Sequence, residues 1–298
     1  MQNCDLSYKV VFAKNPELIT DELWIAGGVY GNIYAIEKLN EIANDKDIVY
    51  NGDLHWFDAN ENCFFEVENL TKNSIKLNGN VELELARKDD EFGCGCNYPE
   101  WEEEIIVKNA EIIHQRLKNI KADFSIFNKR KTTLFANVCG LNVAITHGDE
   151  KTLNGWGFDH EVLAKDERIL EIKNWFSKTK FDVIATTHTC KAVVMNLGQN
   201  VFINNGSTGM PNFSEFITGL ATRISTTKHD KALYRTKLKD VYIELVMIKY
   251  NRKKFLSYFD ELWEEGSAAA ISYKERILGY GCPLSYKDIN LGGFEEVF

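Results

Sequence analysis

The chain has 298 residues, 44% of them hydrophobic and 27% charged, which is ordinary usage for a globular protein. Its formal net charge of −9 argues against nucleic acid as a major partner, because a broad phosphate-binding surface needs a surplus of lysine and arginine. There is no apolar run near the roughly 20 residues that cross a bilayer and no basic-then-apolar leader, so we expect a soluble, cytoplasmic protein with no membrane partner.

Short apolar runs that end in glycine or in polar turns recur along the chain. Such runs are typical of strands buried on both faces, in a sheet that helices cover. Helical patterns over residues 32–43 and 60–70 separate the first of them, which predicts an α/β fold with its loops gathered at the carboxyl ends of the strands. The runs read LWIAGG, DIVYNGD, SIKLNGN, NVAITHGD, FDVIATTHT and NVFINNGS.

The second half of the chain changes character twice. Apolar residues at helical spacing predict a long polar helix over residues 101–120 and another over 167–177. Residues 223–250 have the composition of strands, and the segment after residue 251 predicts two helices with a glycine-serine break between them. We therefore predict an α/β domain over residues 1–250 and a helical extension over 251–298 that packs on it.

The seven cysteines are an odd number in a long chain, which favours reduced thiols over a disulfide framework. Cys94 and Cys96, in FGCGC, form the only cluster. The simplest interpretation is two small residues in a glycine loop. A metal or redox role stays open, although two thiols alone do not complete a tetrahedral site.

The turn in WIAGGVYGN, residues 24–32, is compatible with dinucleotide binding. Ala26, Gly28 and Gly31 follow a strand and open a helix, and Asp53 lies near the end of the next strand. Glycines in such a turn let a pyrophosphate approach the positive end of the helix. However, the first glycine of the fingerprint is Ala26, and Asp53 follows Gly52 in a loop. A dinucleotide-binding oxidoreductase is therefore our third alternative.

Taken together, the strand ends resemble another family. In order they read GGVYGN, NGD, NGN, THG, THT and NNGST. This order is similar to that of the calcineurin-like metallophosphoesterases, which have Asp-x-His-Gly-Asn, Gly-Asp, Gly-Asn-His-Glu or Asp, His-Gly, Gly-His-x-His and Asn-x-Gly-Ser. The resemblance covers roughly residues 23–211. It implies a four-layer α/β/β/α sandwich of two mixed sheets, with two divalent metals at the strand ends.

The resemblance implies one complete metal site. Its four ligands would be Asp53, Asn80, His147 and His188, and the first three of these would also be the catalytic residues. Carboxylate, amide oxygen and imidazole are ligands that suit Mn, Fe or Zn. The resemblance therefore predicts one divalent metal per chain at this set.

The other half of the family's site is incomplete. The positions of its Asp and two His ligands fall on Gly28, Tyr30 and Cys190, and Val81 stands where the family has a histidine that assists the leaving oxygen. Glycine offers no donor atom, and a phenol with a pKa of about 10 is a poor ligand at neutral pH. Proton transfer by such a histidine is typically worth about 10²–10⁴ in rate.

Four residues are candidates to repair the site or to contact a substrate. His55 follows Asp53 by two residues, and we expect it to share the same rim with Asp58. Tyr30 and Cys190 are possible substitute ligands, and Tyr30 is also a possible hydrogen-bond donor to a phosphate. The fourth candidate is Asn32, whose simplest role is to cap its helix.

The resulting expectation is a metal-dependent phosphoesterase that hydrolyses a phosphate mono- or diester at a degenerate, single-metal site. Its partner would be a phosphate-containing substrate or ligand. The alternative is an inactive binding or scaffold protein of the same fold, indicated by Gly28, Tyr30 and Val81. The sequence leaves open the substrate, the metal and the oligomeric state.

Overall fold

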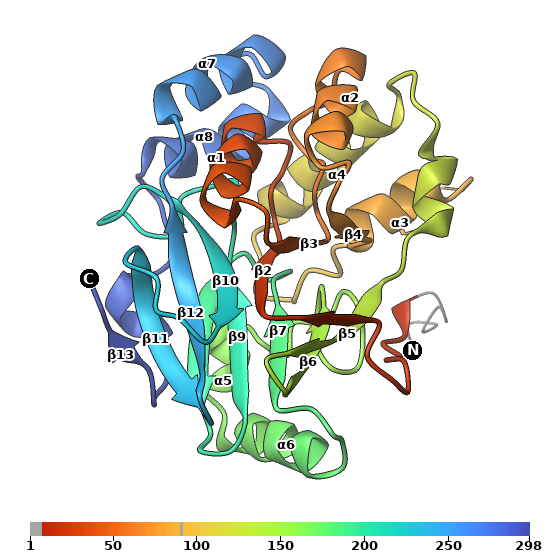
Figure 1. Cartoon of the computed structure of the whole chain (residues 1–298). Coiled ribbons are helices and arrows are strands. Elements are labelled where there is room, and N and C mark those ends of the chain that lie inside the picture. The colour runs from red at the N-terminus through yellow and green to blue at the C-terminus, as the bar shows by residue number, and fades with distance from the viewer. Residues whose placement is uncertain (1–7, 90–91) are drawn as a thin grey trace.

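Two β-sheets stacked face to face form the centre of this computed structural model, which describes residues 8–89 and 92–298 (Figure 1). The six-stranded sheet has the order β1-β5-β6-β7-β9-β8, and the seven-stranded sheet has the order β13-β11-β12-β10-β2-β3-β4. Both sheets are mixed. In the larger one, β2 to β4 pair in parallel and β10 to β12 pair antiparallel.

The strands are short and regular. Their bounds are β1 Leu18–Thr20, β2 Glu22–Ala26, β3 Asp47–Asn51, β4 Ile75–Leu77, β5 Thr133–Val138, β6 Leu141–Thr146, β7 Val183–Thr186, β8 Ala192–Asn196, β9 Val201–Asn205, β10 Gly219–Ser225, β11 Ala232–Leu238, β12 Val241–Ile248 and β13 Glu295–Glu296. The helices are α1 Ile33–Ala43, α2 Glu61–Leu70, α3 Asn80–Ala86, α4 Glu104–Lys118, α5 His160–Leu163, α6 Asp166–Ser177, α7 Arg252–Leu262 and α8 Ala268–Leu278, with 3₁₀ turns η2 Phe124–Lys129 and η3 Tyr286–Ile289.

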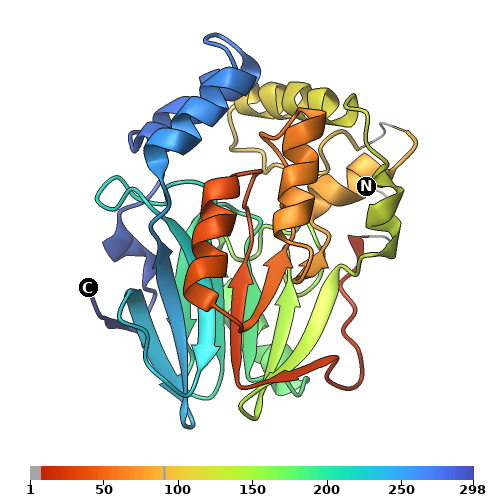
Figure 2. The same cartoon turned by 45° about the horizontal axis from the view of Figure 1, so that its top comes forward.

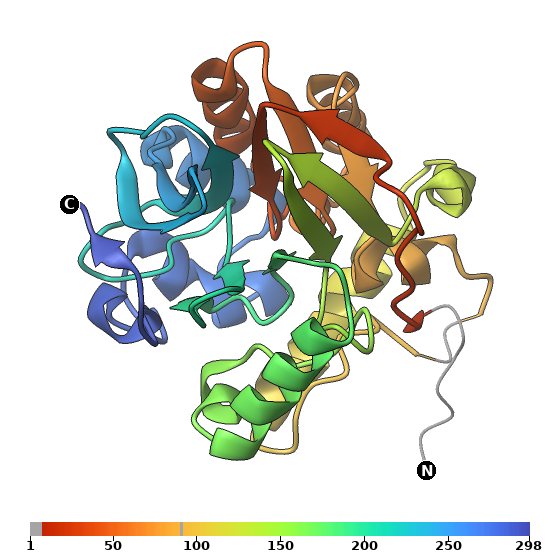
Figure 3. The same cartoon turned by 60° about the horizontal axis from the view of Figure 1, so that its bottom comes forward.

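Successive side chains of a strand point to opposite faces of its sheet, so the apolar residues of one strand contribute to two different cores. Leu23 and Ile25 of β2 belong to a core shared with strands of the other sheet, whereas Trp24 and Ala26 belong to a core shared with α1. Helices α1, α2, α7 and α8 cover the seven-stranded sheet (Figures 1 and 2). Helices α5 and α6 cover the other sheet (Figure 3). The predicted four-layer sandwich is confirmed.

The predicted helices exist, with small shifts at their ends. Asn32 and Asn60 cap α1 and α2 by accepting hydrogen bonds from the amides of Ala35 and Asn62. The helix predicted over 101–120 is α4, which begins at Glu104. Helix α3 and strands β1, β5 and β8 were not predicted from the sequence.

The C-terminal segment contributes to the same core as the sheets. Phe255, Phe259 and Trp263 pack in one cluster with residues of β2 and α1. The Trp263 indole donates a hydrogen bond to the Phe57 carbonyl at 2.8 Å, and the guanidinium of Arg116 lies 4.1 Å from its ring. Beyond the two predicted helices, β13 pairs with β11, which the sequence did not indicate. The division at residue 250 stays a prediction.

Within residues 8–89 and 92–298, none of the helices combines the length and the apolar character that a bilayer crossing requires.

Replacing Trp263 tests whether the C-terminal helices and the sheets unfold together. Trp263 is fully buried, so we expect Trp263→Ala to lower the free energy of unfolding by about 3–5 kcal/mol in one cooperative transition. Urea denaturation followed by circular dichroism measures this. The matched control is Trp101→Ala, which should stay within about 0.5 kcal/mol because Trp101 is 52% exposed. A separate early transition for the C-terminal helices would contradict the expectation.

Candidate metal centre

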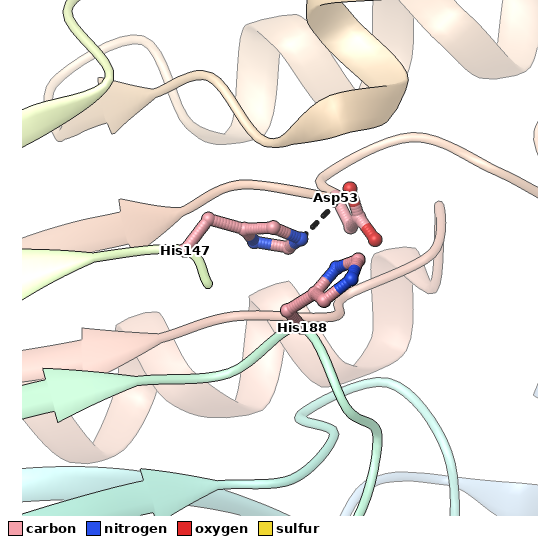
Figure 4. Close-up of side chains that lie close together, drawn as sticks. All are labelled: Asp53, His147 and His188. Atoms are coloured by element: carbon pink, nitrogen blue, oxygen red, sulfur yellow. Dashed lines mark ion pairs between the residues drawn. The ribbon is translucent and has the colours of Figure 1, made fainter. Parts of the chain in front are cut away.

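Four loops, two from each sheet, meet at one edge of the sandwich. Asp53 follows β3, Asn80 opens α3 just after β4, His147 follows β6, and His188 follows β7. Within each sheet these strands are parallel, so their carboxyl ends lie together. One ligand atom each from Asp53, His147 and His188 lies within 4.8 Å of the others (Figure 4). The side-chain oxygen of Asn80 lies 3.1 Å from Nε2 of His147, so the structure brings all four predicted ligands together.

A buried carboxylate holds the Asp53 loop. Glu82 accepts hydrogen bonds from the backbone amides of Asp53, Leu54 and Gly79 at 3.0, 2.8 and 2.8 Å, and its side chain is fully buried. Asp53 has a φ of +50°, a conformation that costs a non-glycine residue free energy. The hydrogen bonds to Glu82 offset that cost. Glu82 therefore orients the backbone of both ligand loops.

Glycine is required where the two loops touch. A Cβ added to Gly52 would lie 2.6 Å from backbone atoms of Gly79 and 2.6 Å from Nδ1 of His147. Gly52 also has a φ of +78°, which favours glycine. The glycine before Asp53 therefore allows the close approach that places the carboxylate beside His147.

Lone pairs converge around His147. Its Nδ1 lies 2.8 Å from the Asn51 carbonyl oxygen, which can only accept, so Nδ1 carries a proton. Its Nε2 lies 3.3 Å from Oδ1 of Asp53 and 3.1 Å from Oδ1 of Asn80. The Asn80 amide nitrogen donates to the Cys94 carbonyl at 2.9 Å, which turns its oxygen toward His147. A neutral imidazole would face two oxygen lone pairs, so the geometry requires either a proton on Nε2 or a cation.

His188 also has a ring nitrogen that makes no hydrogen bond within the described part of the chain. Its Nε2 donates to the Cys96 carbonyl at 3.2 Å. Its buried Nδ1 finds no hydrogen-bond partner among the residues that the structure describes, and such an unsatisfied group is costly. The ring centroids of His188 and His147 lie 5.0 Å apart. The donor set of carboxylate, amide oxygen and two imidazoles therefore fits one divalent ion of the Mn, Fe or Zn type.

The two histidines differ in their pKa values. Burial lowers the pKa of His188 to about 3, so its imidazole is neutral at physiological pH. Burial also disfavours the charged form of His147, but the carboxylate of Asp53 outweighs burial and raises the pKa of His147 above its ordinary value. Burial alone would raise the pKa of Asp53, and the two imidazoles outweigh it, so this pKa is lowered.

The loop of Cys94 and Cys96 positions two of the four predicted ligands. The carbonyl of Cys94 accepts from Asn80, and that of Cys96 accepts from His188. Both cysteines are buried and joined by a disulfide, so the expectation of reduced thiols is wrong for this pair. The other cysteines among the described residues are free. The sequence did not show that this loop supports predicted metal ligands.

On the incomplete side of the site, Tyr30 and Cys190 contact each other. The Tyr30 hydroxyl lies 2.6 Å from the Cys190 sulfur, and a Cβ added to Gly28 would lie 3.0 Å from the Tyr30 ring and hydroxyl. Burial raises the pKa of both Tyr30 and Cys190, so both groups are neutral at physiological pH. Both residues line the cavity beside Asp53, as neutral hydrogen-bonding groups.

His55 does not share this rim, which corrects the expectation. Its Nδ1 lies 2.6 Å from Asp58 and its Nε2 lies 2.9 Å from Glu68, while its fully buried ring stacks on Phe64. Burial lowers the pKa of His55, but Asp58 and Glu68 outweigh burial and raise it to about 9. Both ring nitrogens are therefore occupied in a separate buried charge cluster, and His55 cannot complete the metal site.

The side-chain oxygen and nitrogen of Asn32 both have hydrogen-bond partners. The backbone amides of residues 28–31 also have partners. The Asn32 side chain accepts from Ala35 and donates to the Gly209 carbonyl at 2.7 Å, so it does not contact a substrate. The amides of residues 28–31 donate to the carbonyls of residues 52–54 at 2.8–3.2 Å. A pyrophosphate would have to displace these hydrogen bonds. The geometry therefore does not support the dinucleotide alternative.

A cavity opens beside the four predicted ligands. It holds about 360 Å³ of space between side chains, including the part open to solvent, and Asp53, Asn80 and His188 are among its lining residues. Its aromatic lining was not predicted from the sequence, in which only Trp56 closely follows a predicted ligand, Asp53. The missed residues are Trp56, Tyr98, Trp156 and Tyr273.

Comparison with solved structures confirms the fold. A hypothetical protein from Pyrococcus horikoshii OT3 is similar at a TM-score of 0.58, with 12% identity over 86% of this chain and 98% of that one. A metallophosphoesterase from Sphaerobacter thermophilus is similar at a TM-score of 0.51, with 13% identity over 80% of this chain and 93% of that one. At such identity the likeness shows the fold. The chain has the metallophosphoesterase fold, as the strand-end motifs indicate.

No protein-family model matches the sequence, and no curated protein matches it.

Metal affinity should depend on pH through His147. Its raised pKa means that a proton competes with the ion, so affinity should fall about tenfold per pH unit below that pKa and level off above it. His188, with a pKa of about 3, should release no proton near neutrality. Calorimetric titration of Mn²⁺ in two buffers with different ionisation enthalpies measures the protons released. Equal affinity at about pH 6 and about pH 9 would contradict the expectation.

Proposed function

We propose that the chain is a metal-dependent phosphoesterase, for a phosphate mono- or diester, that works with one divalent ion held by Asp53, Asn80, His147 and His188. The supporting observation is the convergence of oxygen and nitrogen lone pairs at Nε2 of His147, together with the unpartnered Nδ1 of His188. The fold adds support, because solved structures with this fold include a metallophosphoesterase. A cytoplasmic location remains a prediction from composition.

A divalent ion at this site would supply Lewis-acid activation of a phosphoryl group and of water. The chain itself contributes the carboxylate of Asp53, which lowers the positive charge of the centre and helps to orient His147. Across the cavity, the neutral Tyr30 hydroxyl can donate a hydrogen bond to a phosphoryl oxygen, since its raised pKa keeps the proton on the phenol. Substrate orientation therefore depends on neutral donors on one side and charged ligands on the other.

Protonation of the leaving group should be the slow step of the reaction. Val81 lies at the cavity on α3, next to the ligand Asn80, and offers no proton. A positioned acid is typically worth about 10²–10⁴ in rate, so turnover should be slow for esters with basic leaving groups.

The alternative is a binding or scaffold protein of the same fold. The contact between Tyr30 and Cys190 favours it, because neutral groups occupy the side of the cavity where the resemblance would place the other ion. Val81 favours it as well. This alternative predicts ligand binding without turnover.

Metal stoichiometry and hydrolysis together test the proposal. We expect one Mn²⁺ per chain by elemental analysis, and slow hydrolysis of p-nitrophenyl phosphate or bis-p-nitrophenyl phosphate that a chelator removes. Asp53→Asn and His188→Ala should each abolish turnover and lower Mn²⁺ affinity by at least about tenfold. The control Asp240→Asn changes a side chain that is 98% exposed and should change nothing. One bound ion without turnover would favour the binding protein, and no bound ion would refute the proposed site.

Restoring an imidazole at position 81 should raise the rate. We expect Val81→His to increase kcat for aryl phosphates by about tenfold or more, because it places a general acid beside Asn80. Val81→Leu is the matched control, which enlarges the side chain without adding a proton donor and should not raise kcat. Steady-state kinetics with Mn²⁺ measures both. Equal kcat for the two variants would show that protonation of the leaving group does not limit the rate.

A further inference from the structure

In addition to Tyr30, aromatic rings from four other segments line the cavity beside the candidate metal ligands. Trp56 follows Asp53, Tyr98 follows the disulfide loop, Trp156 lies in the loop after β6, and Tyr273 lies on α8. We infer that this site takes a phosphate or phosphonate group attached to a planar aromatic ring, with the ring held against Trp156 and Tyr98. The inference rests on the proposed function and names its substrate class.

The Trp156 ring is fixed directly beside a metal ligand. Its indole nitrogen donates to the Cys96 carbonyl at 3.1 Å, the same carbonyl that accepts from His188. Its ring centroid lies 5.2 Å from that of His188 and 5.9 Å from that of Tyr98. A planar group against Trp156 would thus lie next to the ligand set, and aromatic pairs at such distances are favourable beyond the area they bury.

The charged residues that line the cavity limit which further groups a substrate can carry. Among its described lining residues Asp53 is the one carboxylate, and there is no lysine or arginine. A second anionic group, as in a polyphosphate, would find no charged partner there and would lose its hydration. The cavity therefore suits a neutral ring better than a second charged group.

The C-terminal helix α8 completes this wall. Arg276 donates to the carbonyls of Cys190 and Pro211, both at 2.8 Å, which fixes α8 against the two loops. Tyr273 lies one turn before Arg276 and packs edge-on against Phe57, with ring centroids 5.1 Å apart. The C-terminal segment therefore contributes a ring to the cavity, and its sequence helps to determine which leaving group is accepted.

Binding of two matched phosphonates tests the inference without turnover. Phenylphosphonate and cyclohexylphosphonate have the same charged group and similar size, but only the first is planar. In calorimetric titrations of the Mn²⁺-loaded full chain, we expect phenylphosphonate to bind about two- to tenfold more tightly. Trp156→Leu should remove this preference and Trp156→Phe should keep it, while Trp101→Leu, at a residue 52% exposed, should leave it unchanged.

Titration with Mn²⁺ alone checks that each variant retains its site. If Trp156→Leu loses Mn²⁺, Tyr98→Leu replaces it in the comparison and should also remove the preference. Equal binding of the two phosphonates by Mn²⁺-loaded wild type overturns the inference and leaves the proposed function standing. A preference that survives both substitutions overturns it as well. If the wild type binds neither Mn²⁺ nor either phosphonate, the proposed function and the inference fail together.

Discussion

The buried carboxylate of Glu82 joins the two loops on which the candidate site depends. It accepts amide hydrogen bonds from Asp53 and Leu54 after β3 and from Gly79 after β4. Hydrogen bonds to a charged acceptor contribute about 1.5–3 kcal/mol each, and without them three backbone donors would lose these partners. They hold Asp53 in its left-handed conformation, which directs its carboxylate toward His147.

The two sides of the cavity differ in polarity for a physical reason. On one side, Asp53, His147 and His188 are buried titratable groups, each of which is costly unless it is paired or binds a cation. On the other side, Tyr30 and Cys190 satisfy each other as neutral groups and leave no uncompensated charge. The cavity therefore has titratable groups on one side and a neutral contact on the other.

Much of the fold could be predicted because its signals are local. Continuous apolar runs identified strands buried on both faces, and Asn32 and Asn60 marked helix starts through capping. Helix α3 was not predicted, because it is only 7 residues long and begins directly at Asn80, a predicted ligand that looked like part of a turn. Strand β13 pairs with β11, more than 50 residues earlier in the chain, and no local pattern predicts such a contact.

The candidate site also has a part that local sequence predicts and a part that it does not. The sequence by itself determined which residue types follow each strand, and the order of these loops was enough to predict that Asp53, Asn80, His147 and His188 meet. Tertiary structure decided everything that depends on distant partners. It pairs His55 with Glu68 away from the site, and it supports Asn80 and His188 through the cysteine loop. It also forms the aromatic wall that includes Tyr273. The carboxyl ends of parallel strands lie at one edge of a sheet whatever side chains the strands carry, so this part of the site can be predicted from the sequence. Hydrogen-bond partners and ring contacts between distant segments exist only once the chain has packed.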